Sequence, residues 1–287
     1  MGRIDVALAL LGLMVAAFIA WVLSQPARAR RRRARLRGRP FPPEWSAILR
    51  RRMPAFRRLP PELQRQLEGH VLVFLAEKEF VGCNGLEVTE EMRVTIAAQA
   101  CVLILNRRTD YYFPNLTQVL VYPGAFVVER EEYDEAGVRS RERQVLVGES
   151  WTDSQVILSW EDVLEGAAVE DDGWNVVLHE FAHQLDQAKG YASGAPELPG
   201  AERYAAWSEV FSAEFERLRE RGEDPESLLD EYGATDPAEF FAVVTEVFFE
   251  QPLELQAEHP ALYRELSRFY RVDPATWPAP RPIEAPS

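Results

Sequence analysis

Cysteine and histidine are both scarce in this chain. Its 287 residues include two cysteines, Cys83 and Cys101, and four histidines. Two cysteines cannot supply a disulfide framework or a metal site built from several thiolates, and their scarcity fits a reducing compartment. With 47% hydrophobic and 27% charged residues, the composition also excludes a disordered or collagen-like chain and permits a sizeable buried core.

Positive charge is sparse outside the first forty residues. Residues 1–40 hold nine arginines and one aspartate, a net charge of +8. Residues 41–287 carry 23 basic and 45 acidic residues, a net charge of −22, which gives −14 for the whole chain. A body with this excess of negative charge repels phosphate backbones. The sequence therefore predicts no direct nucleic acid binding.

A long run without charge or strongly polar groups stands near the start of the chain. It covers residues 6–23 and would be about 27 Å long as a helix, close to the thickness of a bilayer core. Eight arginines follow between Arg28 and Arg39, whereas only Arg3 precedes the run. The positive-inside rule predicts a single-pass bacterial inner-membrane protein with a cytoplasmic body. The Arg28–Arg39 cluster is expected to contact anionic lipids.

Two other interpretations of this run are weaker. A cleaved secretory signal has its basic residues before a shorter apolar segment, and no A-x-A site precedes the arginines here. A buried core helix would need apolar neighbours before residue 60, where the sequence is basic and interrupted by proline. We therefore expect residues 1–23 to be a transmembrane anchor.

The rest of the chain divides into three parts by composition. Residues 24–60 are rich in arginine and proline and predict a juxtamembrane linker that leads into the first helices. Residues 61–273 show helical patterns, then strand patterns and then helical patterns again, and predict the folded domain. Residues 274–287 include five prolines and predict a disordered tail.

The predicted fold class is α+β, with a small, mostly antiparallel sheet packed on helices. Helical spacing of apolar residues runs through residues 63–74, and a second helix should begin after Thr89, whose hydroxyl can cap it. Strand-like sequences then cluster in the middle of the chain, and helical patterns return after Trp174. The predicted strands are residues 117–122, 124–128, 144–147 and 155–160, and the predicted later helices are residues 204–221, 237–249 and 261–270.

Two of the four histidines lie in an H-E-x-x-H motif, His179-Glu180-Phe181-Ala182-His183. Residues four apart on a helix differ by about 40° in direction, so His179 and His183 can bind one Zn²⁺ together. Glu180 lies at the edge of that face, where it can take a proton from metal-activated water. The alternative is that these are ordinary helix residues, but the flanking sequence is so apolar that three polar groups need a reason.

A catalytic zinc needs a third protein ligand, and a carboxylate is expected. His70 and His259 are poor candidates, one in the middle of a helix before the sheet and the other before a proline. Asp236 and Pro237 read as the N-cap and first residue of a helix, so Glu239 could equally serve a capping box. Spacing alone leaves three candidates open: Glu239, Glu246 and Asp186.

Two long stretches carry a resemblance to a known family. Residues 175–186 and 232–243, with shorter matches at 148–151, 157–160 and 269–270, look like the MtfA family (Mlc titration factor A). These are bacterial zinc-dependent peptidases whose catalytic core is similar to that of anthrax lethal factor. The resemblance covers roughly residues 60–275.

The resemblance implies a zincin fold with a gluzincin-type site. In such a site a glutamate from a later helix completes the ligand set, which here falls on Glu239 beside His179 and His183. A tyrosine seven residues earlier assists catalysis, and that position is Tyr232. The resemblance also implies a possible transcriptional regulator as partner, since the family is named for binding the repressor Mlc.

These observations predict a membrane-anchored peptidase that uses one Zn²⁺ per chain to hydrolyse a peptide or protein substrate. Glu180 would be the general base, and Tyr232 would stabilise the oxyanion. Residues 117–122 or 155–160 could pair with the substrate as a sheet edge. Asp186 could orient a ligand imidazole or simply lie on the helix surface. The alternative function is a membrane-tethered binding protein that sequesters a cytoplasmic transcriptional regulator, with zinc only structural.

Overall fold

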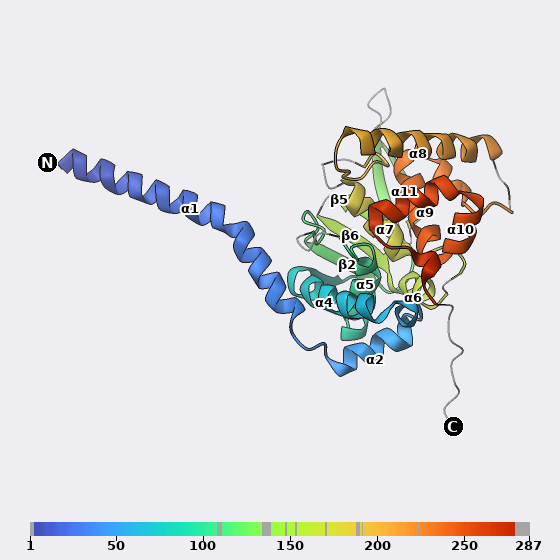
Figure 1. Ribbon diagram of the computed structural model, residues 1–287, viewed down its shortest axis with the longest axis horizontal. Helices are drawn as coiled ribbons and strands as arrows, with labels where there is room; N and C mark the ends of the chain where they lie inside the picture. Colours follow the sequence, from blue (N-terminus) through green and yellow to red (C-terminus); the bar gives the residue numbers. More distant parts are fainter. Residues whose placement is uncertain are drawn as a thin grey trace.

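The first segment of the chain forms one long helix that stands out from the rest of the protein in this computed structural model (Figure 1). Helix α1 (Arg3–Arg37) carries exposed apolar side chains from Leu10 to Leu23. Within Leu10–Arg37 the most apolar stretch has a mean hydropathy of 1.8 and is not buried against the protein. Its length and composition are sufficient to cross a membrane, and a signal sequence would have the same properties.

The structure describes residues 3–278, except for residues 108–110, 134–138, 147, 153, 170, 188–189, 191, 223 and 225. For residues 3–9 and for the strands between residues 126 and 152 it describes the backbone alone. Part of the predicted tail is ordered, because Pro274–Thr276 forms a short 3₁₀-helix, η3, and Trp277 packs against Phe249. The remainder of the predicted tail, residues 279–287, lies outside the described residues.

The last turns of α1 are bound to the body of the protein through arginine side chains. Arg32 and Arg33 each form a 2.8 Å ion pair with Glu77. Arg37 donates a hydrogen bond of 3.1 Å to the hydroxyl of Tyr112. Part of the arginine cluster is therefore held by protein groups, whereas the sequence suggested lipid contacts for all of it.

The segment predicted as a linker is folded over much of its length. Helices α2 (Pro43–Arg52) and α3 (Ala55–Arg58) lie within it. Five of its apolar side chains belong to the main hydrophobic core: Ile48, Leu49, Met53, Phe56 and Leu59. The proline-rich composition was misleading because Pro42, Pro43 and Pro54 stand at helix starts, where a missing N–H costs nothing.

The main sheet has four strands in the order β1-β2-β6-β5. Strands β1, β2 and β6 are parallel, and only β5 runs antiparallel to its neighbour. A separate antiparallel pair is formed by β3 and β4. The bounds are β1 (Glu79–Gly82), β2 (Gln118–Tyr122), β3 (Phe126–Tyr133), β4 (Arg139–Leu146), β5 (Gly148–Thr152) and β6 (Gln155–Ser159). The prediction of a mostly antiparallel sheet is therefore wrong.

The connections explain why the strand directions were mispredicted. Parallel neighbours need a crossover connection, and helix α5 (Glu90–Val102) provides it between β1 and β2. Between β2 and β6 the crossover consists of the β3–β4 pair and β5, so strands that are close in sequence are not neighbours in the sheet. The short strand β1 was also missed, because it directly follows a helix.

Helices surround the sheet and supply most of the core, as the α+β prediction expected. Thr89 caps α5 by accepting a 3.2 Å hydrogen bond from the backbone of Met92. Helix α9 is almost wholly buried, and α8 lies alongside α9 and α11 (Figure 1). The remaining bounds are α4 (Pro61–Glu77), α6 (Trp160–Ala168), α7 (Val176–Asp186), α8 (Ala201–Arg221), η2 (Glu231–Ala234), α9 (Pro237–Glu250), α10 (Pro252–Glu258) and α11 (Pro260–Tyr270).

Candidate active site

The H-E-x-x-H motif lies on α7, a mostly buried helix packed against α9 and the β5–β6 side of the sheet. Asn175 begins the helix, since its side chain accepts a 3.0 Å hydrogen bond from the backbone of Leu178. The predicted cap at the start of α9 is also present: the Asp236 carboxylate accepts hydrogen bonds from the backbone of Ala238 and Glu239. The two caps fix where each helix starts and therefore which side chains face each other.

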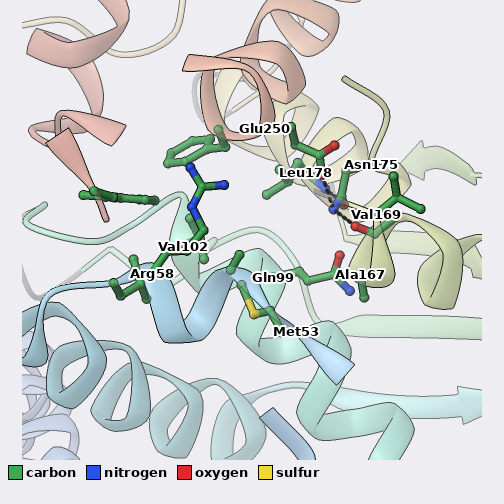
Figure 2. A pocket seen from close by; sticks show the side chains of 14 residues that line it. Met53, Arg58, Gln99, Val102, Ala167, Val169, Asn175, Leu178 and Glu250 are labelled. Carbon is green, nitrogen blue, oxygen red and sulfur yellow. Dashed lines mark hydrogen bonds between the residues drawn. The ribbon is translucent and has the colours of Figure 1, made fainter. Parts of the chain in front are cut away.

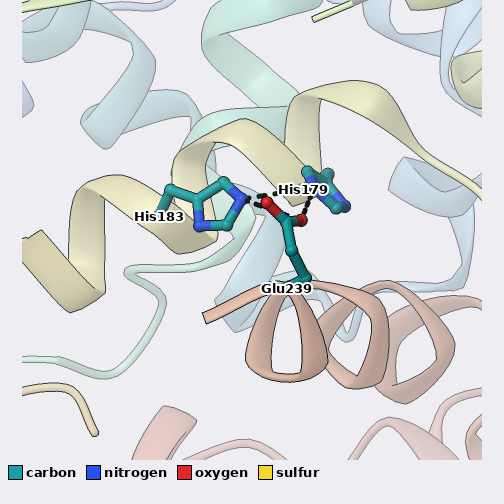
Figure 3. Close-up of side chains that lie close together, drawn as sticks. All are labelled: His179, His183 and Glu239. Carbon is teal, nitrogen blue, oxygen red and sulfur yellow. Dashed lines mark hydrogen bonds and ion pairs between the residues drawn. The ribbon is translucent and has the colours of Figure 1, made fainter. Parts of the chain in front are cut away.

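Three side chains from these two helices converge on one point (Figure 3). The Nε2 atom of His179 lies 3.0 Å from Oε2 of Glu239 and 3.2 Å from Nε2 of His183. The third side of the triangle, from His183 Nε2 to Glu239 Oε2, is 3.4 Å. Glu239 thus turns its side chain toward the histidines instead of back to its own cap, so the capping-box interpretation does not hold.

The donor set fits a tetrahedral metal ion. Ligand atoms bound to Zn²⁺ at 2.0–2.1 Å in tetrahedral geometry lie about 3.3–3.4 Å apart, close to all three distances in this triangle. Two imidazole nitrogens 3.2 Å apart would otherwise compete for one proton. Burial alone would raise the pKa of Glu239, but its hydrogen bonds to the histidines hold that pKa well below the ordinary value. The ligand carboxylate is therefore anionic.

Glu246 contacts the other nitrogen of His179, not the point where the three ligands converge. Its Oε1 lies 2.7 Å from His179 Nδ1, and its Oε2 accepts a 2.6 Å hydrogen bond from the backbone N–H of Asn175. A carboxylate at Nδ1 keeps the proton on that nitrogen and leaves Nε2 free to bind a metal. Among the three acids that spacing left open, Glu246 is thus an orienting group and Glu239 is the candidate ligand.

Asp186 serves the loop that follows α7. Its carboxylate accepts backbone hydrogen bonds from Ser193, Gly194 and Ala195 at 2.6 to 3.1 Å. Gly194 has φ of +71°, and a Cβ there would lie 2.2 Å from the carbonyl oxygen of Pro237. Asp186 therefore holds this loop against the first turn of α9, next to Glu239, and no described hydrogen bond joins it to a histidine.

Glu180 is buried beside the converging ligands. Only 5% of the residue is exposed, and its Oε2 has no hydrogen-bond partner among the described residues. Burial raises its pKa to about 7, although His179 and His183 act in the opposite direction. An unpartnered buried carboxylate is costly unless something occupies the space before it. The position is right for a group that handles the protons of a bound water.

Tyr232 lies in η2, close to His179. Its ring centroid is 6.0 Å from that of His179, and 52% of the residue is exposed. Partial burial, followed by the nearby carboxylates of Glu239 and Glu180, raises its pKa to about 12. The phenol therefore stays protonated at neutral pH and can donate a hydrogen bond to a ligand at this site.

The sequence did not identify the role of Asn175 and Glu250. The Asn175 side chain donates hydrogen bonds to the carbonyl of Gly166 at 2.7 Å and to Glu250 Oε1 at 3.0 Å. Glu250 borders a cavity of about 40 Å³ behind the start of α7 (Figure 2). A usable signal was present, since Glu250 is the last residue of a mostly apolar helix.

Replacing Glu250 with glutamine should flatten the dependence of stability on pH. Burial, and then the nearby charge of Asp172, raises the pKa of Glu250 to about 10, far above that of an unfolded glutamate. The folded state therefore binds the extra proton, and its stability falls as pH rises from about 4.5 toward 10. Glu250→Gln keeps the acceptor for Asn175 without this penalty. Thermal midpoints at pH 6 and pH 9 should converge in the variant, and an unchanged difference would contradict the assignment.

The two remaining histidines form hydrogen bonds elsewhere in the protein. His70 Nδ1 is 2.7 Å from the hydroxyl of Tyr112, and His259 Nδ1 is 2.8 Å from Glu214 Oε2. Neither belongs to the cluster of possible metal ligands found in the described part of the chain. The candidate centre thus consists of His179, His183 and Glu239.

Two histidines of an H-E-x-x-H helix joined by a glutamate from a later helix define a metallopeptidase-type site. Comparison with known proteins agrees. The profile of the glucose-regulated metallo-peptidase M90 family matches residues 27–271, and the chain belongs to this family. Membership implies that the centre holds a metal ion.

The chain is also similar to curated proteins over most of its length. It is 41% identical to an uncharacterized protein of Synechocystis, over 89% of this chain and 94% of that one. It is 36% identical to Mlc titration factor A of Klebsiella pneumoniae, over 77% of this chain and 84% of the relative. The corresponding protein of Escherichia fergusonii is 34% identical, over 83% and 89%. The resemblance to the MtfA family is thereby confirmed.

Proposed function

We propose that this protein is a zinc-dependent peptidase, held in the membrane by α1 with its catalytic domain in the cytoplasm. The observation that carries the proposal is a buried Glu180 carboxylate with an unpartnered oxygen, directly beside three side chains with the spacing of tetrahedral ligands. A structural metal site would not need a buried acid with an unpartnered oxygen next to its ligands. The observation favours hydrolysis over pure binding.

His179, His183 and Glu239 would hold the ion. Two neutral imidazoles and one carboxylate are a preferred set for Zn²⁺, and they leave a coordination position open. Bound zinc supplies Lewis acidity, which lowers the pKa of water and polarises the scissile carbonyl. Glu246 keeps His179 in the required tautomer through its contact with Nδ1.

Glu180 and Tyr232 divide the proton chemistry between them. Glu180 accepts a proton from the attacking water and delivers it to the nitrogen of the leaving amine. Tyr232 remains protonated and donates a hydrogen bond to the carbonyl oxygen as negative charge develops there. The ring of Tyr232 lies next to that of His179, which puts the phenol near the candidate metal ligands.

An extended substrate would pair with strand β5. Strands β2 and β6, which the sequence suggested as substrate edges, are both interior, and the sheet ends at β1 and β5. Of these two edges only β5 has substantial packing against α7, the helix of His179 and His183. Backbone pairing along an edge strand binds peptides of many sequences, since side chains contribute little to it.

Replacing Tyr232 with phenylalanine should lower kcat by about a hundredfold or more, since one transition-state hydrogen bond is worth on the order of 3 kcal/mol. The ring next to His179 is kept, so KM and metal content should stay near the wild-type values. Steady-state kinetics on a peptide substrate, with the metal content measured in parallel, check this. A zinc-replete variant with a kcat within a few-fold of wild type would leave Tyr232 as a turn residue only.

The membrane topology can be tested separately. A reporter fused after Ser287 should behave as cytoplasmic, because the arginines follow the apolar run of α1. Protease added from the periplasmic side should leave the reporter intact until the membrane is opened. Cleavage of the reporter in sealed spheroplasts would contradict the proposed orientation.

The relatives named Mlc titration factor A support a second role for this chain, in which it binds a transcriptional regulator. Such binding is compatible with hydrolysis. If binding a regulator were the sole function and zinc were only structural, the biological effect of the protein would not depend on Glu180.

A further inference from the structure

A second pocket is lined mainly by arginines. Its volume is about 660 Å³, within the range of small-molecule sites, and the three candidate metal ligands do not line it. Its basic side chains come from α1, from the segment after α5, and from α8, α11 and the residue that ends α11: Arg30, Arg107, Arg203, Arg268 and Arg271. Segments far apart in the sequence thus bring five positive charges together.

The local charge is only partly balanced. Among the described residues of the lining, Glu197 is the only acidic one. Glu265, buried behind the pocket, pairs with Arg203 at 2.9 Å and with Arg268 at 2.8 Å. Among the described residues, Arg107, Arg203, Arg268 and Arg271 outnumber these two glutamates by two, on a body that carries −22 between residues 41 and 287. Such a concentration of like charge is unfavourable without an anion to offset it.

Arg107 is held in place by two aromatic rings. Its guanidinium lies 4.2 Å from the ring centroid of Phe269 and 5.4 Å from that of Tyr111. Its Nη1 is buried without a hydrogen-bond partner, and no described carboxylate forms an ion pair with Arg107. Two aromatic rings fix the plane of the guanidinium, and a planar, oriented guanidinium is well suited to bind two phosphate oxygens at once.

The pocket lies where α1 meets the body. Arg30 follows the end of the apolar run at Leu23 by seven residues, roughly 10 Å along a helix. If the run spans the bilayer core, as proposed above, this is close to the headgroup layer, which is roughly 5–8 Å thick on each side. An anionic headgroup can therefore reach the pocket from the membrane surface.

We infer that this arginine pocket binds a phosphate group, carried by the headgroup of an anionic phospholipid or by a small soluble phosphate ester. The lipid source rests on the proposed membrane anchor, whereas the phosphate chemistry does not. Arg107 would make the bidentate contact, and Arg268 and Arg271 would neutralise the remaining charge.

The test compares a pocket variant with a control of equal charge. Arg268→Gln with Arg271→Gln removes two arginines from the pocket. Arg264→Gln with Arg219→Gln removes two arginines outside it, and Arg219, like Arg268, pairs with a glutamate three residues earlier on its own helix. The full chain is placed in phosphatidylcholine nanodiscs with or without phosphatidylglycerol, or in detergent if it does not insert. Glycerol 3-phosphate is the soluble probe.

For a soluble source, glycerol 3-phosphate should bind in phosphatidylcholine discs or detergent, and the pocket variant should bind it roughly tenfold more weakly or worse. For a lipid source, phosphatidylglycerol should raise the thermal midpoint of wild type and control, but not of the pocket variant. The inference would be overturned if the pocket variant and the control lost the same affinity or the same thermal shift. It would also be overturned if the wild type responded to neither glycerol 3-phosphate nor phosphatidylglycerol. Peptide hydrolysis and sedimentation with membranes are measured separately, so failure of the peptidase or anchor proposals would be seen independently.

Discussion

Glu180→Gln should nearly abolish peptide hydrolysis while the protein keeps its metal. The amide occupies the same buried space but cannot accept a proton from water, and general-base catalysis contributes on the order of 10²–10⁴-fold. His179, His183 and Glu239 are unchanged, so zinc content should match the wild type. The variant should also be at least as stable, because burial of a carboxylate with an unpartnered oxygen is removed.

Glu209→Gln is a matched control, since Glu209 is exposed on α8 and lies outside the candidate centre. It makes the same chemical change and should leave kcat and metal content unaltered. If Glu180→Gln hydrolysed peptides at a rate close to wild type with full zinc content, Glu180 could not be the general base. In that case, a binding protein with a structural zinc ion would explain the retained zinc better than a peptidase would.

Glu239→Gln and Glu246→Gln should separate a ligand from an orienting group. Glu239→Gln removes the anionic ligand, so the purified variant should lose its metal on dialysis and all activity with it. Glu246→Gln leaves the three ligands in place but can donate to His179 Nδ1, which favours the wrong tautomer. Its zinc affinity should fall by about 10–100-fold, and excess zinc should restore part of the activity.

Competition with a chromophoric chelator measures the zinc affinity of each of the two variants. The two substitutions are chemically identical and lie two helical turns apart on α9, so a general effect on that helix would alter them alike. If Glu246→Gln lost its metal completely and Glu239→Gln retained it, the assignment of the two acids would be reversed.

Several helices and the candidate histidine pair were the most predictable features of this chain. The H-E-x-x-H spacing follows from helix geometry, and the caps at Asp236 and Thr89 depend on neighbouring residues only. Local rules therefore located α4, α5, α8, α9 and α11 and proposed the histidine pair, whereas α6 and α10 were not predicted. The choice of Glu239 over Glu246 needed the family resemblance, because both lie on one face of the same helix.

Features that depend on distant segments were not predictable in the same way. The directions of β1, β2 and β6 depend on crossovers, which a strand's own sequence does not record. The roles of Asp186 and Glu250 depend on the loop at Gly194 and on Asn175, which lie on other elements. Likewise, the arginines after the apolar run looked equivalent in sequence, whereas Arg33 and Arg37 contact Glu77 and Tyr112 of the body.

The most direct test of the central claim is to assay the purified full-length protein against a broad peptide library, with its metal content determined in the same preparation. The account predicts about one zinc per chain, hydrolysis that a chelator abolishes, and recovery when stoichiometric zinc is returned. A folded protein with one zinc per chain that cleaves no peptide in the library would contradict it.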